Sequence, residues 1–127
     1  CIRDRFIAGP STLTLLATTS TNDAHPIGFL IARKAADEAE LLTIGVLADY
    51  RKIRIGGSLL RQAMLDLKAA GARALYLEVD ETNHPALALY RRHGASVVGS
   101  RPGYYENGSN AAILQVDLQA SPLGPST

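Results

Sequence analysis

The sequence has little cysteine: Cys1 is the only one among 127 residues, and tryptophan is absent. A lone cysteine excludes an internal disulfide, and a cysteine-based zinc site would need further ligands that the sequence lacks. Such sparing use of cysteine is typical of a reducing compartment, so we expect a cytoplasmic protein.

Long hydrophobic runs and a strong charge of one sign are also missing. Apolar runs such as Leu41 to Ala48 are far shorter than the roughly 20 residues of a membrane-spanning helix, and no signal-peptide pattern opens the chain. The formal net charge is only +1, whereas general nucleic-acid binders carry a strongly basic face. The sequence therefore predicts no membrane and no nucleic-acid partner.

What is present is the composition of an ordinary globular protein, with 46% apolar and 20% charged residues. A domain of this length buries roughly two-thirds of the surface that its unfolded chain exposes. We expect a single domain over residues 1–118, followed by a disordered tail at 119–127 that contains prolines and serines.

The first half of the chain predicts an antiparallel meander of strands. Cys1 to Pro10 mixes charged and apolar residues and ends in Gly-Pro, which predicts the tail of a helix or a loop. Ser11 to Ser20 alternates threonine with leucine, as a half-buried strand does. Ile27 to Lys34 and Leu41 to Leu47 follow as further strands after short polar turns.

The second half predicts a right-handed strand–helix–strand crossover and a closing pair of strands. Apolar residues recur at helical spacing before a stop at Gly71, namely Leu59, Leu60, Ala63, Met64 and Leu67. The apolar run Ala74 to Val79 suits a central strand parallel to the strand before the helix. A short helix at Ala86 to His93 precedes strands at Ala95–Ser100 and Ala111–Leu118. The fold class is therefore mixed α/β.

The stretch from Leu41 to Leu67 is the centre of the chain, because a strand, a basic glycine-bearing turn and a helix together make an anion site. The first unpaired N–H groups of such a helix point toward the turn, and the helix dipole favours negative charge there. Arg51, Lys52 and Arg54 lie in this turn. From this segment alone two interpretations stay open: a solvated basic loop, or clamps for a pyrophosphate.

Several ordered motifs resemble the GNAT acetyltransferase family, and their spacing is most similar to RimI-like enzymes, which acetylate protein N-termini. The resemblance runs from about Leu41 to Leu118 and rests on RKIRIGGSLL, LEVDETNHPALALY, Gly94 and Gly103-Tyr104-Tyr105. It implies a mixed, mostly antiparallel sheet with a splayed parallel pair in the middle and flanking helices. Family domains begin with a strand and one or two helices, which Cys1 to Pro10 is too short to hold, so these are expected to be missing or shortened.

In this family the turn cradles the pyrophosphate of acetyl-coenzyme A and reads Arg or Gln, two residues, Gly, one residue, Gly or Ala. The resemblance assigns the turn's binding role to Arg51, Lys52, Ile53, Arg54, Ile55, Gly56, Gly57 and Ser58. Arg54 stands where the first glycine is expected. Its side chain could obstruct the phosphate or force a costly backbone dihedral, or it could swing outward and bind phosphate.

The neighbouring strand and the next turn complete the implied cofactor site. Backbone groups of Ile44, Gly45 and Val46 are expected to pair with pantetheine like an added strand, and the N–H of Val46 to polarise the thioester carbonyl. Gly45 is compatible with the bulge at which the family splays this strand. Asn83 matches an asparagine that hydrogen-bonds pantetheine; without the resemblance it would be a helix cap or turn residue.

Two side chains are candidates for catalysis. Glu78 is a lone carboxylate in an apolar strand, where desolvation favours proton uptake and suits a general base; the alternative is an ion pair at the strand end. Tyr90 stands at the family's separation from this base and is expected to protonate the coenzyme A thiolate; the alternative is a core tyrosine. Tyr104 and Tyr105 match a loop that helps to line the acceptor groove.

No metal site is predicted. Asp80, Glu81 and His84 would need a helix to face one side, and the sequence around them favours a turn. His25 and His93 lack partner patterns and are expected on the surface.

The leading hypothesis is an enzyme that moves an acetyl group from acetyl-coenzyme A to an amine, with a protein N-terminal α-amine as the expected acceptor. A small amine or a lysine side chain is an alternative acceptor, and binding of acyl-coenzyme A without turnover is an alternative function. A nucleotide-binding α/β domain is disfavoured because GxxxxGK[ST] and GxGxxG are missing. We expect a monomer or a weak homodimer.

Overall fold

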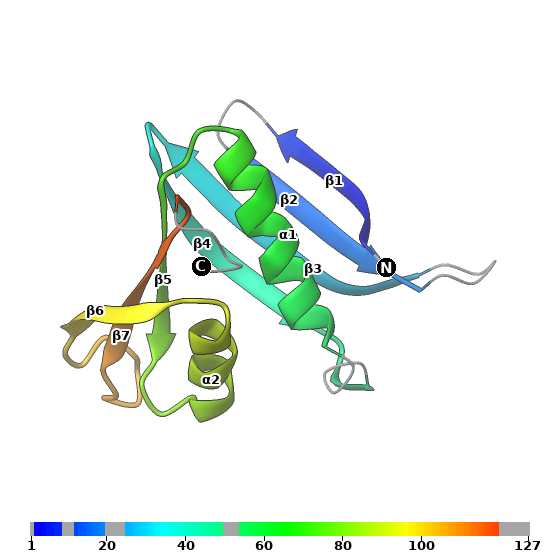
Figure 1. The fold of residues 1–127 in the computed structure, drawn as a ribbon. Helices are drawn as coiled ribbons and strands as arrows, with labels where there is room; N and C mark the ends of the chain where they lie inside the picture. Colours follow the sequence, from blue (N-terminus) through cyan, green and yellow to red (C-terminus); the bar gives the residue numbers. More distant parts are fainter. Residues whose placement is uncertain (1, 9–11, 20–24, 50–53, 120–127) are drawn as a thin grey trace.

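The computed structural model describes residues 2–8, 12–19, 25–49 and 54–119. Residues 120–127 of the tail predicted to be disordered, and Arg51, Lys52 and Ile53 of the basic turn, lie outside this range. The described strands form one sheet in the order β1-β2-β3-β4-β5-β7-β6 (Figure 1). The elements are β1 (Ile2–Ala8), β2 (Thr12–Thr18), β3 (Pro26–Ala35), β4 (Glu38–Val46), α1 (Ile55–Ala69), β5 (Ala74–Asp80), α2 (His84–Arg92), β6 (Ser96–Arg101) and β7 (Ala111–Asp117).

Strands β1 to β4 form an antiparallel meander, which confirms the expectation from the alternating pattern. β3 and β4 are longer than predicted, because the turn between them is only Ala36 and Asp37. On the far side of the sheet, β7 pairs antiparallel with both β5 and β6. The sheet is therefore mixed and mostly antiparallel, as predicted.

The prediction for the first ten residues is wrong. Ile2–Ala8 form a strand at the edge of the sheet, paired antiparallel with β2 from Ile2↔Ala17 to Ala8↔Thr12. A first strand was expected to be missing or shortened, and a strand of seven residues is present at this edge. Only residues 9–11 separate β1 from β2.

Helix α1 covers one face of β2, β3 and β4 (Figure 1). Its buried stripe is close to the one predicted, with Ile55, Leu59, Leu60, Ala63 and Leu67. These side chains join the fully buried leucines of the sheet in one core, and burying a leucine side chain contributes roughly 1.5–3 kcal/mol relative to exposure. The packing fixes the start of α1 relative to β4. No helix in the described ranges is long and apolar enough to cross a membrane.

Strands β4 and β5 pair in parallel only near their first residues, from Glu38↔Ala74 to Glu40↔Tyr76. Beyond this point β4 continues to Val46 and β5 to Asp80 without mutual pairing, and the two ribbons diverge in Figure 1. The predicted splayed parallel pair is thus confirmed. Because α1 follows β4 and α2 follows β5, both helices begin at the diverging end.

Candidate active site

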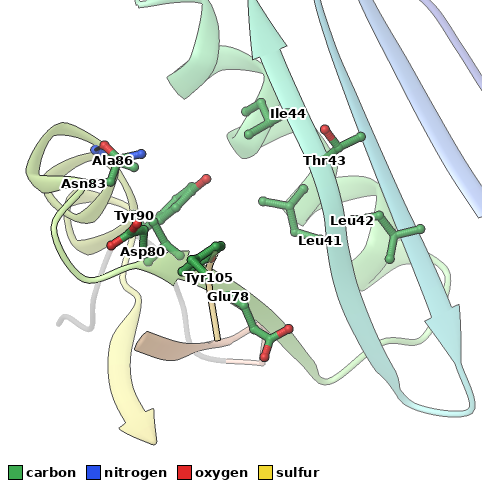
Figure 2. Close-up of a pocket in the computed structure, with 11 residues that line it drawn as sticks. Leu41, Leu42, Thr43, Ile44, Glu78, Asp80, Asn83, Ala86, Tyr90 and Tyr105 are labelled. Carbon is green, nitrogen blue, oxygen red and sulfur yellow. Dashed lines mark hydrogen bonds between the residues drawn. The ribbon is translucent and has the colours of Figure 1, made fainter. Parts of the chain in front are cut away.

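A cleft of about 290 Å³ lies where β4 and β5 diverge. Figure 2 shows Leu41 and Ile44 of β4 facing Tyr90 across it. The walls come from β4 (Leu41–Ile44), the end of β5 (Glu78–Asp80), α2 and the turn before it (Asn83, Ala86, Tyr90) and the loop after β6 (Tyr105). The structure therefore brings together five residues predicted from the sequence: Ile44, Glu78, Asn83, Tyr90 and Tyr105.

The backbone of β4 is oriented toward this cleft. Leu47, the first residue after β4, donates its N–H to the carbonyl of Ile27 at 2.8 Å, which fixes the hydrogen-bonded positions of the β3–β4 ladder. Such positions alternate in an antiparallel pair. The backbone N–H and C=O groups of Ile44 and Val46 therefore point away from β3, toward the diverging edge, as strand-like pairing with an extended ligand requires.

The bulge in β4 lies at Leu42 and not at Gly45. Leu41 and Thr43 pair with consecutive residues of β3, so Leu42 is the extra residue. Gly45 instead lies opposite Phe29, whose ring carbon Cε1 would be 2.6 Å from a Cβ at this position. The missing side chain at Gly45 therefore makes room for the Phe29 ring, which the sequence pattern did not indicate.

Helix α1 has an unusual start. Its N-cap residue, Arg54, has φ 66° and ψ 27°, in the left-handed region that costs a non-glycine residue roughly 1–2 kcal/mol. The costly dihedral considered from the sequence is therefore present, and Arg54 keeps the backbone shape that glycine would adopt. Among the described residues no side chain caps this helix, and its first turn has no acidic residue. The first N–H groups of α1 thus have no side-chain acceptor within the part of the chain that the structure describes.

Ile55, Gly56 and Ser58 form the first turn of α1, and they pack differently. Ile55 is a core residue, and the N–H of Ser58 donates to the carbonyl of Arg54 at 3.1 Å. A Cβ at Gly56 would meet its nearest neighbour, a methyl of Leu89, at an ordinary 3.5 Å. A side chain as small as alanine would therefore fit at Gly56 without a clash with the rest of the protein.

Gly57 is where the start of α1 meets the end of α2. A Cβ there would lie only 3.1 Å from Nε2 of His93, the C-cap residue of α2. His93 is partly buried, which corrects the prediction of a surface residue. Burial, and then the charges of Arg61 and Arg92, lower the pKa of His93 below its usual 6.5.

Glu78 lies on the face of β5 that points away from the core. Buried and partly exposed residues alternate along this strand, with Leu77 and Val79 buried on the other face. Oε2 of Glu78 lies 2.7 Å from Nε of Arg101 on β6, and the Glu78 side chain is 25% exposed. Oε2 is buried and accepts no hydrogen bond of good geometry. Its contact with Arg101 is therefore an ion pair in which the Nε–H bond does not point at Oε2. The cation partner considered as the alternative for Glu78 is therefore present.

Tyr90 reaches the cleft from the opposite face of β5. It is 7% exposed and belongs to the same core cluster as Leu77 and Val79. Burial, with a smaller contribution from Tyr105, raises the pKa of Tyr90 above its usual 10.0. The hydroxyl therefore stays protonated near neutral pH and can donate a proton, although it is a weaker acid than a free phenol.

Asn83 is the N-cap of α2, so the helix-cap interpretation of this residue is confirmed. Its Oδ1 accepts the backbone N–H of Ala86 at 3.2 Å, and Pro85 stands in the first turn. The side-chain NH2 group provides separate donors, and Asn83 also lines the cleft. The cap therefore uses only the Oδ1 atom of this side chain.

Asp80 ties the end of β5 to the loop before β7. Its carboxylate accepts hydrogen bonds from the backbone and hydroxyl of Thr82 at 2.9 and 2.8 Å and from the hydroxyl of Ser109 at 2.7 Å. The backbone bond from Thr82, followed by the Ser109 and Thr82 hydroxyls, lowers the pKa of Asp80 below 3.8. These hydrogen bonds hold Asp80 in place in the cleft wall, and they were not predicted from the sequence.

Only one of the two predicted acceptor-side tyrosines lines the cleft. Tyr105 does so, while Tyr104 is 50% exposed. The two rings meet edge to face with centroids 5.1 Å apart, and the guanidinium carbon of Arg101 lies 5.4 Å from the Tyr104 ring centroid. Burial, and then the charges of Asp80 and Glu78, raise the pKa of Tyr105.

Sequence reasoning missed Arg101 and the apolar wall formed by Leu41 and Leu42. The one available signal for Arg101 was its place at the end of a predicted strand, just before the tyrosine loop. The bulge that sets Leu42 apart leaves no mark in the hydrophobic pattern.

Comparison with known proteins relates the whole arrangement to acetyltransferases. The model of the acetyltransferase (GNAT) family matches residues 3–95. A ribosomal protein bS18-alanine N-acetyltransferase from Haemophilus influenzae is 39% identical over 92 residues, which cover 69% of this chain and 62% of that protein. An N-alpha-acetyltransferase from Sulfolobus acidocaldarius is 34% identical over 82 residues, covering 64% of this chain and 49% of that protein. The chain thus spans about half to two-thirds of the length of these relatives.

Solved structures share the fold. The crystal structure of the ribosomal-protein-S18-alanine N-acetyltransferase from Escherichia coli superposes with a TM-score of 0.76 at 27% identity, covering 94% of this chain and 76% of that one. Arabidopsis thaliana NAA60 in complex with acetyl-CoA gives a TM-score of 0.76 at 23% identity, with 88% and 79% of the two chains covered.

Proposed function

The chain belongs to the acetyltransferase (GNAT) family, and on this premise we propose that it transfers an acetyl group from acetyl-coenzyme A directly to an amine. The observation that carries the proposal is the cleft that Glu78 and Tyr90 reach from opposite faces of β5. An acceptor can approach from the Glu78 face and the cofactor from the Tyr90 face. The two substrates then meet between β4 and β5.

The α1 side of the cleft suits coenzyme A. The start of α1, which no side chain in the described ranges caps, offers backbone N–H groups and the positive end of a helix dipole to a pyrophosphate, and Arg54 adds a cation. The backbone groups of Ile44 and Val46 would pair with pantetheine, with the N–H of Val46 facing the thioester carbonyl. The NH2 group of Asn83 would donate to the same arm. The proposed roles of Arg51, Lys52 and Ile53 rest on the family resemblance.

Acetyl-coenzyme A supplies the acetyl group as a thioester, and the side chains on the β5 side manage the protons. Glu78 would take a proton from the amine as its nitrogen bonds to the carbonyl carbon. The carbon–sulfur bond then breaks, and Tyr90 would give its proton to the sulfur. This division suits groups on opposite faces, because one proton leaves on the acceptor side and another is needed on the cofactor side.

A protein N-terminal α-amine is the proposed acceptor. The relatives from Haemophilus influenzae and Sulfolobus acidocaldarius are named a ribosomal protein bS18-alanine N-acetyltransferase and an N-alpha-acetyltransferase, and Tyr105 provides a wall of the cleft on the proposed acceptor side. The single cysteine suits the cytoplasmic location that we propose for the protein.

A thiol-release assay with acetyl-coenzyme A and a panel of amines tests the proposal. The panel holds peptides with a free α-amine, the same peptides with a blocked α-amine and a lysine, and small amines. Wild type is expected to release thiol with the free α-amine peptides, and Glu78→Gln to lose at least about a hundredfold in kcat, as removal of a general base does. Arg33→Gln is the control, because Arg33 forms a surface pair with Glu40 at 3.0 Å and does not line the cleft.

The outcomes separate the candidate functions. Equal rates in wild type and Glu78→Gln would remove Glu78 from the mechanism. Calorimetric binding of coenzyme A without thiol release for any amine would leave the chain as an acyl-coenzyme A-binding module.

A further inference from the structure

We infer that Arg101 is a positioning residue for Glu78: it holds Oε2 of the carboxylate and thereby presents Oε1 to the acceptor amine. The inference rests on the proposed function, because it gives Arg101 a part in that reaction. Arg101 touches neither the proposed amine nor the thioester, and it acts through Glu78.

The two carboxylate oxygens of Glu78 have different surroundings. Oε2 is buried and lies 2.7 Å from Nε of Arg101. No described residue donates a hydrogen bond to Oε1, and unlike Oε2 this oxygen is not buried. The exposed quarter of the side chain therefore includes Oε1. Since Oε2 is held by the guanidinium, proton acceptance falls to Oε1.

The sheet places Arg101 where it can do this. Glu78 is paired with Ile113 of β7, and Arg101 is paired with Ala111 of the same strand. Residues two apart on a strand share a face, and so do directly paired residues. The Arg101 side chain thus reaches Glu78 diagonally across β7, on the face away from the core.

Arg101 is itself held on its other side. The Tyr104 ring lies 5.4 Å from its guanidinium carbon, and Tyr105 supports Tyr104 edge-on while lining the cleft. A guanidinium between a carboxylate and an aromatic face has fewer accessible rotamers than a free one. The acceptor wall and the proposed base are therefore linked through Arg101.

The neighbouring charges make such a partner necessary. Asp80 lies two residues beyond Glu78 on the same face of β5, and hydrogen bonds from Thr82 and Ser109 fix its carboxylate. Residues two apart on a strand share a face, and two negative charges held there repel each other. Without Arg101, Glu78 would turn away from Asp80, and Oε1 would no longer have a fixed direction toward the cleft.

The test compares Arg101→Gln with Arg101→Lys in the thiol-release assay. Arg101→Gln is expected to lower kcat about tenfold, part of the contribution of a general base, while KM for acetyl-coenzyme A stays within about twofold. Arg101→Lys keeps the positive charge beside Oε2, and because the contact is an ion pair without an aimed hydrogen bond, it is expected to recover to within about threefold of wild type. Arg33→Gln is the matched control, since the Arg33 and Arg101 side chains are both 56% exposed and both pair with a glutamate.

A readout without turnover separates this inference from the proposed function. The Arg101 Nε chemical shift in 15N NMR is expected to be the same in wild type and in Arg33→Gln and to change in Glu78→Gln, because that substitution removes the carboxylate charge 2.7 Å from Nε. An unchanged Arg101 Nε shift in Glu78→Gln overturns the positioning role alone. The positioning role is also overturned if Arg101→Gln keeps the kcat of wild type. It is overturned as well if Arg101→Lys is as slow as Arg101→Gln and loses as much melting temperature. Absence of thiol release by wild type with every amine overturns the proposed function, and the role of Arg101 with it.

Discussion

The two helices begin at the same end of the cleft in opposite ways. Helix α1 starts at Arg54, whose backbone is left-handed and whose side chain makes no capping bond among the described residues. Helix α2 starts at Asn83, whose side chain caps the N–H of Ala86 and is followed by Pro85 in the first turn. The start of α1 carries backbone strain and has no side-chain cap from the described residues, whereas the start of α2 is capped and stabilised.

The difference indicates how the cleft divides its work. An open helix start binds anions through backbone groups, which are the same for every sequence. The β5 and α2 side instead offers particular side chains, among them Glu78 and Tyr90. We therefore expect substitutions on the α2 side to change turnover and substitutions at the start of α1 to change stability and cofactor affinity.

The sharpest attempt to break this comparison is Tyr90→Phe. If Tyr90 protonates the thiolate, its loss is expected to lower kcat roughly ten- to hundredfold, less than Glu78→Gln, because a thiolate with a reference pKa of ~8.5 can leave without a proton donor. Affinity for coenzyme A, measured by calorimetry, should stay within about threefold of wild type.

Tyr76→Phe is the matched control for this prediction. Tyr76 lies on β5 outside the cleft, and its hydroxyl accepts a hydrogen bond from Gln115 at 2.9 Å. Its loss should leave kcat unchanged. A Tyr90→Phe enzyme with normal kcat but weak coenzyme A binding would contradict the division between backbone binding and side-chain chemistry.

The sequence was sufficient where a repeated pattern decides the structure. The apolar spacing of α1 and the apolar run of β5 both predicted elements that are present. It failed at β1, where Arg3, Asp4 and Arg5 interrupt the alternation. A strand at the edge of a sheet has a neighbour on one side only and tolerates charge, so the pattern there is weak.

The site was predictable to the extent that it is local. Glu78, Asn83 and Tyr90 lie within one strand, turn and helix, at the separations on which the family resemblance rested, and all three line one cleft. Arg101 meets Glu78 only because β7 inserts between β5 and β6 in the sheet. That order depends on pairing between distant segments, which no local pattern reports. His93 and Gly57 are a second pair of residues that are far apart in the sequence and adjacent in the fold.

A smaller effect is expected at the start of α1. Arg54→Gly should raise the free energy of unfolding by about 0.5–1 kcal/mol, because glycine adopts φ 66° without the penalty that arginine carries, less the entropy that glycine loses on folding. Urea denaturation measures the change. Glycine keeps the backbone shape and removes one charge, so coenzyme A should bind a few-fold more weakly at low salt, with a smaller difference at high salt. Tighter binding would mean that the arginine side chain obstructs the phosphate.

The start of α2 provides the counterpart of opposite sign. Asn83→Ala removes the side-chain cap and is expected to lower the free energy of unfolding by about 1 kcal/mol. The same urea experiment compares the two variants. If both changed stability in the same direction, the contrast between a strained and a capped helix start would be wrong.

The smallest expected effect lies where the two helices meet, at His93 against Gly57. Burial lowers the pKa of His93 in the folded protein below 6.5, so the unfolded chain takes up the proton more readily. The resulting stabilisation is present above pH 6.5 and is lost as the pH falls through the folded-state pKa. His93→Gln should therefore lose less stability than wild type between pH 7.5 and pH 5 in urea denaturation, while Arg33→Gln, a surface substitution that removes no imidazole, should lose as much as wild type. An equal loss in all three proteins would mean that the end of α2 does not hold the histidine in its uncharged form against the start of α1.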